Sequence, residues 1–266
     1  MNNKIQYSGP EKSSGFTAAE IDQFRKESPL SDAYASPFPG IKLFHQQRIK
    51  AILELLGEAV GKNGGEEYDG RIGLMEFGCG DGFLIEKITE KFITLRTHAV
   101  DISYTALRRA RNRAPAASLI QSDAENTPFT GETFDIALCS EVLEHVPDDV
   151  GLLKEIFRIL RPGAFFVLTT PNLFTLRNVL RQKIGREPKI EFQEHLREYA
   201  YRELVERITS TGFSIVKFRS VGFYIPKMHW FFKSRLISAL IFTLARWFPT
   251  RGRDFMFLLR KPRPVL

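Results

Sequence analysis

Short apolar runs alternate with helical patterns along most of the chain. Between residues 72 and 169, apolar residues form five strand-like runs, and the segments between them repeat their apolar residues at helical spacing. The predicted strands are 72–77, 98–102, 118–121, 134–139 and 164–169. The predicted helices between them are 83–92, 104–113 and 149–160. Because strands that alternate with helices form βαβ units, the pattern predicts a parallel sheet covered by helices.

The flanking segments extend this pattern. Apolar residues at helical spacing predict a helix over 41–60, which Gly61 and the following Asn63-Gly64-Gly65 stretch should end. Further along, a helix over 201–211 has Gly212 at its C-cap position. Two more strands, 213–218 and 255–259, then follow.

These elements define one domain with additions. Residues 1–40 are rich in Ser, Pro and Gly and predict a partly helical N-terminal arm. Residues 41–266 are expected to form a single domain with insertions at about 173–200 and 222–253. Apolar residues make up 43% of the 266 positions, which is enough for a full core.

The cysteine content and the N-terminus indicate a compartment. Two cysteines, Cys79 and Cys139, cannot build a disulfide framework or a four-cysteine zinc site. The first residues lack an apolar h-region, and no run of 18 uncharged apolar residues occurs. We therefore expect a reducing, cytoplasmic location without a secretory signal or a membrane-spanning helix.

The net charge of +7 conceals an asymmetry. Residues 1–150 hold 16 Lys/Arg and 23 Asp/Glu, a net charge of −7, whereas residues 151–266 hold 22 Lys/Arg and 8 Asp/Glu, a net charge of +14. A basic half suits an anionic partner such as a phosphate, a lipid surface or a nucleic acid. Solvated basic side chains without a partner are the simpler alternative.

A glycine-rich turn follows the first predicted strand. Glu76 precedes Gly78, Gly80 and Gly82 there, and a helix comes next. Glycines at such a turn let a ligand approach backbone N–H groups closely. Phe83 stands where a dinucleotide fingerprint needs Gly or Ala, and no Walker lysine follows. Because the Glu76 carboxylate would repel a pyrophosphate, the turn favours a cationic ligand.

Carboxylates also end the next two strands. Asp101 can accept hydrogen bonds from both ribose hydroxyls, and Asp123 can accept one from an adenine amine. Either residue alone could simply be a helix N-cap. Three carboxylates at successive strand ends favour a nucleoside with positive charge, and S-adenosylmethionine is such a molecule.

Together these residues resemble the class I S-adenosylmethionine-dependent methyltransferases. The resemblance covers about residues 72–218. Its motifs are Glu-x-Gly-x-Gly-x-Gly at 76–82, Val100-Asp101-Ile102, Ser122-Asp123-Ala124, Phe134-Asp135 and Leu160-Arg161-Pro162-Gly163.

The resemblance implies an α/β fold and a set of cofactor contacts. The fold would be a Rossmann-like, doubly wound sheet of seven mostly parallel strands, with an antiparallel last strand at 255–259 and helical cap insertions. The implied S-adenosylmethionine contacts are Glu76, Gly78, Cys79, Gly80, Asp101, Ile102, Asp123, Ala124 and Ser140. Of these, Ser140 would lie near the methyl donor.

Two carboxylates and an imidazole follow the fourth strand. Glu141, Glu144 and His145 would reach the sheet edge that faces the methyl group. Methyl transfer to a hydroxyl needs an aligned nucleophile and a proton acceptor. Histidine suits the second role because imidazole titrates near neutral pH. His145, His195 and Glu141 are therefore the candidate catalytic residues.

The Glu-x-x-Glu-His pattern is also similar to two metal-assisted groups. They are the O-methyltransferases of ubiquinone biosynthesis and the small-RNA 3′-end 2′-O-methyltransferases, which add a histidine downstream. The resemblance implies that Glu141, Glu144, His145 and His195 could hold a divalent metal. Two alternatives remain: a histidine acting as a base without metal, and a structural or substrate-positioning role.

Two basic segments indicate the kind of acceptor. Five cations between residues 177 and 189 would suit a phosphate or carboxylate, or they form a solvated helix face. Trp230 and Trp247 bracket an apolar stretch with basic residues at both ends, which suits an interfacial helix. A packed cap helix and a dimer interface are the alternatives for this stretch.

The sequence therefore predicts an S-adenosylmethionine-dependent methyltransferase, most simply one that methylates an oxygen of a small-molecule, glycan or lipid-linked acceptor. RNA 2′-O-methylation is one alternative, although no separate RNA-binding motif is present. A cofactor-binding regulatory subunit without catalytic activity is the other.

Overall fold

The computed structural model describes residues 39–63, 72–190, 195–222 and 249–264. Residues 1–38 of the predicted N-terminal arm and the stretch from Trp230 to Trp247 lie outside the described residues. Within the described part of the chain, no helix combines the length and apolar character needed to cross a membrane.

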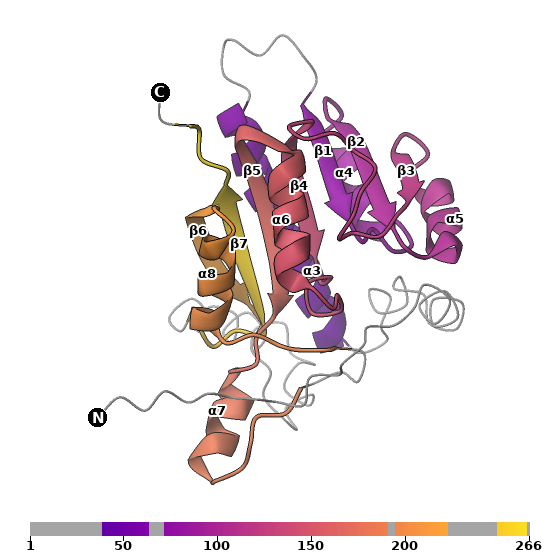
Figure 1. Cartoon of the computed structure of the whole chain (residues 1–266). Helices are drawn as coiled ribbons and strands as arrows, with labels where there is room; N and C mark the ends of the chain where they lie inside the picture. The colour runs from indigo at the N-terminus through magenta and orange to yellow at the C-terminus, as the bar shows by residue number, and fades with distance from the viewer. Residues whose placement is uncertain (1–38, 64–71, 191–194, 223–248, 265–266) are drawn as a thin grey trace.

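Seven strands form one sheet in the order β3-β2-β1-β4-β5-β7-β6 (Figure 1). The first five strands pair in parallel, and β7 runs antiparallel to both of its neighbours. This confirms the expected Rossmann-like, doubly wound sheet with an antiparallel last strand. The strands are β1 (Gly73–Phe77), β2 (Arg96–Asp101), β3 (Ser118–Gln121), β4 (Phe134–Ser140), β5 (Leu160–Pro171), β6 (Ser214–Val221) and β7 (Asp254–Arg260).

Helices cover both faces of the sheet and bury two separate core clusters. The first cluster joins the sheet to α3 (Pro39–Asn63), α4 (Phe83–Lys91) and α5 (Tyr104–Arg113). The second cluster joins the sheet to α6 (Asp149–Ile159) and α8 (Tyr201–Ser210). β1 is buried along its whole length, as expected for a central strand covered on both faces. The cores therefore fix the strand ends at which the candidate ligand residues lie.

Local signals start these helices at the carboxyl edge of the sheet. The Ser103 hydroxyl accepts a hydrogen bond from Ala106 N at the start of α5, and Asp148 accepts one from Gly151 N at the start of α6. Gly82 precedes α4 with φ 82°, and a Cβ there would lie 2.6 Å from the Cα of Ala110. Glycine at this position lets α4 and α5 pack closely.

Several predicted boundaries differ from the structure, and two of them have a clear physical reason. α3 continues through Gly61 to Asn63, and a glycine is tolerated there because it lies in the last turn. β5 begins at Leu160 rather than 164, because Leu160 already pairs with Phe134 of β4, before a register shift in the ladder.

One helix was expected only in general terms, as part of a helical cap insertion. α7 (Leu176–Lys183) follows β5 and stands away from the sheet, beyond the end at which β4 and β5 stop (Figure 1). It lies within the predicted insertion at 173–200 and carries several of the cations of that segment.

Candidate active site at the carboxyl edge of the sheet

The glycine-rich turn after β1 adopts a left-handed backbone. Gly78, Gly80 and Gly82 have φ values of 68°, 54° and 82°, which favour glycine. The N–H groups of Gly78 and Cys79 both donate to the Val100 carbonyl, at 2.8 and 3.1 Å. A Cβ on Gly78 would lie 2.4 Å from Cγ2 of Val142, so the turn also lies against the segment after β4.

Asp101, the last residue of β2, holds this turn in place through a hydrogen bond. Its Oδ2 accepts a 2.7 Å hydrogen bond from Gly80 N, and its Oδ1 accepts a 2.8 Å hydrogen bond from Ser103 N. Asp101 is buried, with 7% of its surface exposed. The carboxylate that was predicted to contact the ribose therefore also positions the glycine turn, a role that the sequence did not indicate.

Glu76 lies under the turn without a full set of partners. It is 2% exposed, and its Oε2 has no hydrogen-bond partner among the described residues. Burial, and then the charge of Asp101, raise the pKa of Glu76 to about 8. A buried carboxylate with an unpartnered oxygen is costly unless a ligand pairs with it.

These features fit S-adenosylmethionine. The cofactor is cationic, so it would stabilise the ionised form of Glu76, whereas a phosphate would oppose it. The glycines leave backbone groups accessible, and Asp101 ends the adjacent strand at the same edge. Glu76, Gly78, Gly80 and Asp101 are therefore the residues that would hold the cofactor.

The other predicted cofactor residues differ in exposure. Asp123 is exposed, and its Oδ1 accepts a hydrogen bond from Glu125 N, so it forms a local turn. Ser140 ends β4, with its hydroxyl 2.9 Å from that of Thr169. Cys79 is buried, which raises the pKa of its thiol, and Ile102 and Ala124 are half-buried. Both Cys79 and Cys139 are free cysteines.

Glu141 is held by α3. It has a left-handed backbone with φ 57°. Its Oε2 lies 2.8 Å from Nη1 of Arg48 on α3, and its Oε1 accepts a hydrogen bond from the Thr169 hydroxyl. Nη1 of Arg48 also lies 3.5 Å from Oδ2 of Asp254 on β7. The only sequence signal for Arg48 was a lone arginine on the apolar side of a helix.

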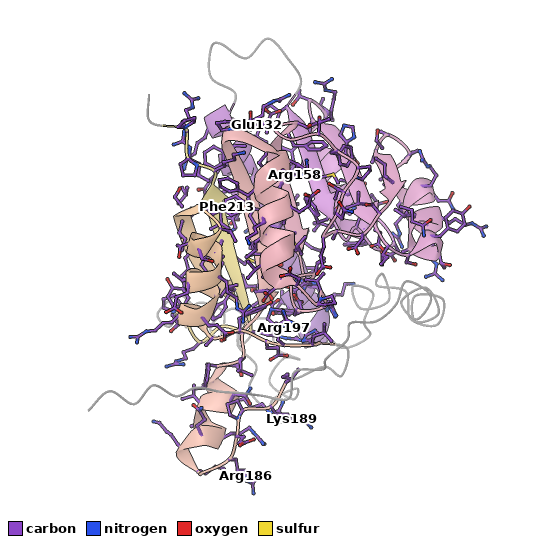
Figure 2. The ribbon with its side chains drawn as sticks, in the orientation of Figure 1. Glu132, Arg158, Arg186, Lys189, Arg197 and Phe213 are labelled. Atoms are coloured by element: carbon purple, nitrogen blue, oxygen red, sulfur yellow. The ribbon has the colours of Figure 1, made fainter. Side chains whose placement is uncertain are left out.

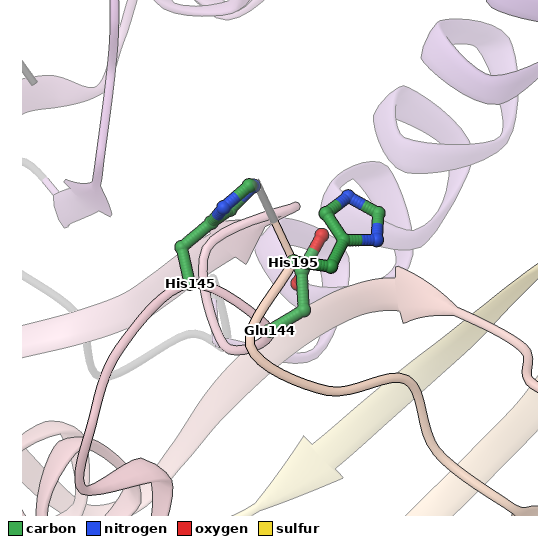
Figure 3. Close-up of side chains that lie close together, drawn as sticks. All are labelled: Glu144, His145 and His195. Atoms are coloured by element: carbon green, nitrogen blue, oxygen red, sulfur yellow. The ribbon is translucent and has the colours of Figure 1, made fainter. Parts of the chain in front are cut away.

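Three of the four predicted metal ligands lie together. Ligand atoms of Glu144, His145 and His195 all lie within 4.8 Å of one another (Figure 3). The two imidazole rings meet edge to face, with centroids 4.9 Å apart. Glu141 does not join this group, because its carboxylate pairs with Arg48.

Glu144 is fully buried beside the imidazoles. Its Oε2 accepts a hydrogen bond from the Thr170 hydroxyl, and its Oε1 has no partner among the described residues. Burial, followed by the charge of Glu141, raises its pKa well above the usual range. The Leu196 N–H donates to the Glu144 carbonyl at 2.9 Å, so the turn after β4 is tied to the segment that carries His195.

Glu198 contacts His195, and Tyr199 ties the same segment to the turn after β4 and to α6. Nδ1 of His195 lies 3.0 Å from Oε1 of Glu198, and both side chains are buried. The Tyr199 hydroxyl donates to the Leu143 carbonyl and to Oδ2 of Asp149. Sequence reasoning missed both residues, although Glu198 lies only three positions after His195. The arrangement can orient an imidazole as a proton acceptor or a metal ligand.

Comparisons with known proteins agree with this geometry. Residues 75–168 match the profile of a family described as a methyltransferase domain. A protein named as a probable S-adenosylmethionine-dependent methyltransferase of Mycolicibacterium smegmatis is 28% identical over 142 residues, 53% of this chain and 52% of that protein. A phthiotriol/phenolphthiotriol dimycocerosates methyltransferase of Mycobacterium tuberculosis is 30% identical over 95 residues, 35% of each chain. The chain spans about half the length, or less, of these curated relatives.

Solved structures share the whole fold at low identity. The [4+2]-cyclase SpnF has a TM-score of 0.62 at 16% identity, covering 94% of this chain and 98% of that one. The N-methyltransferase NodS of Bradyrhizobium japonicum, solved with S-adenosyl-l-homocysteine, has a TM-score of 0.53 at 15% identity, covering 92% and 95%. These likenesses show the fold alone. The matched profile, with the glycine turn and the buried Glu76 inside it, identifies residues 75–168 as a methyltransferase domain whose strand ends fit S-adenosylmethionine.

Proposed function

We propose that this methyltransferase acts on a hydroxyl oxygen of a small-molecule, glycan or lipid-linked acceptor. The observation that carries the proposal is the pair of imidazoles, His145 and His195, beside Glu144 at the carboxyl edge of the sheet. A hydroxyl loses its proton during methylation, so its site needs a proton acceptor.

Different residues bind the cofactor and accept the proton of the acceptor hydroxyl. When bound, S-adenosylmethionine supplies the electrophilic methyl group. His195 is the better-placed base, because a histidine that donates from Nδ1 to a carboxylate keeps Nε2 as the proton acceptor. The buried Glu198 carboxylate would then stabilise the imidazolium that forms. Glu76 and Asp101 bind and orient the cofactor.

One relative supports a lipid-linked acceptor. The Mycobacterium tuberculosis protein that shares 30% identity over 95 residues is named for methylation of phthiotriol dimycocerosates. The stretch bracketed by Trp230 and Trp247, which lies outside the described residues, has the composition of an interfacial segment. Both observations favour an acceptor that is reached at or near a membrane surface.

The test is methyl transfer from labelled cofactor into a fractionated extract of the source cells. We expect label in the small-molecule, lipid or glycan fraction, in a product that carries the new methyl group as a methyl ether. His195→Ala should lower transfer strongly, whereas His98→Ala is the matched control, since that ring packs on Phe129 and Phe134. Label in RNA would contradict the acceptor class, and label on nitrogen would contradict oxygen methylation.

Metal-assisted transfer is a second candidate, favoured by the convergence of Glu144, His145 and His195. Two imidazoles and a carboxylate suit several divalent cations, which would lower the pKa of an acceptor hydroxyl. The test is removal of metal with EDTA, followed by titration of Mg²⁺, Mn²⁺ or Zn²⁺ into the protein and measurement of bound metal. Glu144→Gln should weaken metal binding, and Glu141→Gln should not. Full turnover after EDTA treatment would exclude this candidate.

A further inference from the structure

The helix α7 exposes apolar side chains outside the two cores. Among the residues that the structure describes, six large apolar side chains are exposed, and three of them belong to α7 and its C-cap residue. These three are Leu176, Leu180 and Ile184, which are 36%, 53% and 68% exposed. Because residues four positions apart share one face of a helix, they form a single apolar stripe. An apolar stripe on a projecting helix indicates a contact surface for something outside the domain.

The stripe becomes more exposed with distance from the sheet. Leu176 starts α7 close to the end of β5, and Ile184 lies at the far end of the helix. Figure 2 shows Arg186 at the tip of this segment, farther from the sheet than Lys189. The exposed fraction therefore rises from the base of α7 to its tip. This gradient fits an element whose outer end meets the partner.

Basic side chains flank the stripe. Residues 176–186 hold four Lys/Arg and no Asp or Glu, the four being Arg177, Arg181, Lys183 and Arg186. Lys183 and Arg186 are exposed beside Ile184. Apolar side chains flanked by cations complement an anionic lipid surface, because the apolar groups enter the acyl boundary while the cations meet the headgroups.

Hydrogen bonds hold the segment in this shape. At its base, Asn178 donates from Nδ2 to the Lys189 carbonyl at 3.0 Å and accepts from Lys189 N at 3.2 Å. At its tip, Gly185 has a left-handed backbone with φ 72°, and Arg186 N donates to the Arg181 carbonyl at 2.9 Å. The stripe is therefore presented by a fixed frame and needs little ordering when it binds.

A protein partner, including a second copy of the chain, fits this stripe less well than a membrane. A stable protein interface buries about 800 Å² on each partner. α7 is eight residues long and offers three exposed large apolar side chains, which is a small part of such an area. A lipid surface needs no matching groove, because its affinity grows with apolar area and with each added cation.

We propose that α7 docks on an anionic lipid membrane, with Leu180 and Ile184 in the interface and Lys183 and Arg186 against the headgroups. Since α7 lies beyond the carboxyl ends of β4 and β5, docking brings the edge of the sheet that carries the candidate site toward the bilayer (Figure 1). The docking surface stands on its own observations. Its use in catalysis rests on the proposed function, to which it adds a route for a lipid-linked acceptor.

Co-sedimentation of the full-length protein with vesicles tests the docking. Vesicles of phosphatidylcholine, with and without phosphatidylglycerol, are compared at low and at raised salt. We expect binding to the vesicles that contain phosphatidylglycerol, and this binding should weaken as salt screens the surface charge. Leu180→Gln combined with Ile184→Gln should weaken it about tenfold or more, because two apolar anchors are lost. Lys183→Gln should weaken it about fivefold, because one cation is lost.

Matched variants elsewhere on the surface show whether these losses are specific to α7. Ile93→Gln is the apolar control, since Ile93 is 84% exposed and precedes β2 at the opposite edge of the sheet. Arg108→Gln is the charge control, since Arg108 is an exposed cation of α5. Neither control should change vesicle binding. All variants should keep the melting temperature and the S-adenosylhomocysteine affinity of the wild type.

The possible outcomes separate this inference from the proposed function. Equal vesicle binding by the wild type and the Leu180→Gln/Ile184→Gln variant would overturn the docking. A lower melting temperature of that variant, or loss of a dimer in sedimentation velocity, would also overturn it, because the stripe would then pack on protein. Docking that depends on α7, without methyl label in any lipid, would retain the membrane surface and reject a lipid-linked acceptor. Label in lipid with vesicle binding independent of α7 would reject the docking and retain the proposed function.

Discussion

The N–H of Gly80 donates a 2.7 Å hydrogen bond to Oδ2 of Asp101, which couples the glycine turn to the end of β2. Asp101→Ala should therefore do two things. Loss of the ribose contacts should lower cofactor affinity at least tenfold, and loss of the partner of Gly80 N and Ser103 N should cost about 1–3 kcal/mol of stability for each group. Calorimetry with S-adenosylhomocysteine and urea unfolding measure the two effects.

Asp123→Ala provides the comparison for that variant. Its carboxylate is exposed and accepts a local hydrogen bond from Glu125 N, so its removal should leave stability nearly unchanged. Equal cofactor affinity of wild-type protein and Asp101→Ala would show that the ribose assignment is wrong.

Glu76 should make cofactor binding depend on pH. Its pKa of about 8 lies above its ordinary value near 4.5, so the free protein keeps it protonated at pH 7. A cationic ligand needs the ionised form, and affinity should therefore rise with pH up to about 8. Calorimetry in buffers of different ionisation enthalpy should detect proton release at pH 7. Glu76→Gln is the control, since it retains the titration of the ligand itself.

The same carboxyl should destabilise the free protein as pH rises. The folded state holds a proton that the unfolded state has already released, so stability from this group falls between pH values near 4.5 and 8. Glu76→Gln should accordingly raise the free energy of unfolding at pH 7 by about 1–3 kcal/mol. A variant that is less stable than wild type at pH 7 would contradict this account.

Glu198 should act through His195. Glu198→Gln should lower kcat about tenfold to a hundredfold with little change in KM, because it removes the charge that stabilises the imidazolium. In the double variant with His195→Ala, the Glu198 change should add nothing further. Additive losses in the double variant would mean that Glu198 contributes independently of His195.

The ion pair between Arg48 and Glu141 should stabilise the fold. Both side chains are largely shielded, so Arg48→Met leaves a carboxylate without its partner and should cost about 1–3 kcal/mol. Adding Glu141→Gln should recover part of that loss, because the uncompensated charge is then gone. Urea unfolding of the two single variants and the double variant gives the coupling energy. A coupling energy near zero would rule out a stabilising pair.

Membrane contact of the stretch between Trp230 and Trp247 can be tested by mutation. Changing Trp230 and Trp247 to Ser should weaken co-sedimentation with anionic vesicles even at low salt, since the aromatic anchors act separately from charge. A packed cap predicts the opposite pattern: unchanged sedimentation and a lower melting temperature.

The sequence predicted the sheet well because its signals are local. Each parallel strand is a short apolar run bounded by polar residues, and the start of α5 at Tyr104 follows from the Ser103 cap. The glycine turn was equally readable, because its three left-handed positions all require glycine. The bounds of α7 could not be predicted, because its polar, basic sequence buries little apolar surface.

The geometry of the acceptor side depends on contacts between residues that lie far apart in the sequence, and local sequence patterns do not reveal them. Arg48 reaches Glu141 across 93 positions of the chain, and that pairing removes Glu141 from the group of imidazoles. His195 meets His145 where Leu196 N donates to the Glu144 carbonyl, a contact between segments that lie far apart in the sequence. Such long-range pairings follow from strand order and loop packing, which no local pattern reports.

The contacts of Asp149 should limit how often the His195 segment separates from the turn that carries His145. Its carboxylate accepts a hydrogen bond from the Tyr199 hydroxyl and forms ion pairs with Arg207 at 2.8 Å and Arg197 at 3.1 Å. These contacts lie at the base of the turn that carries His145. Separating the His195 segment from that turn would break these contacts together, so the two imidazoles should part only in rare, large openings. The Leu196 amide should then exchange its hydrogen about as slowly as the core strands. If an acceptor enters through a faster movement than this separation, that movement occurs in other segments.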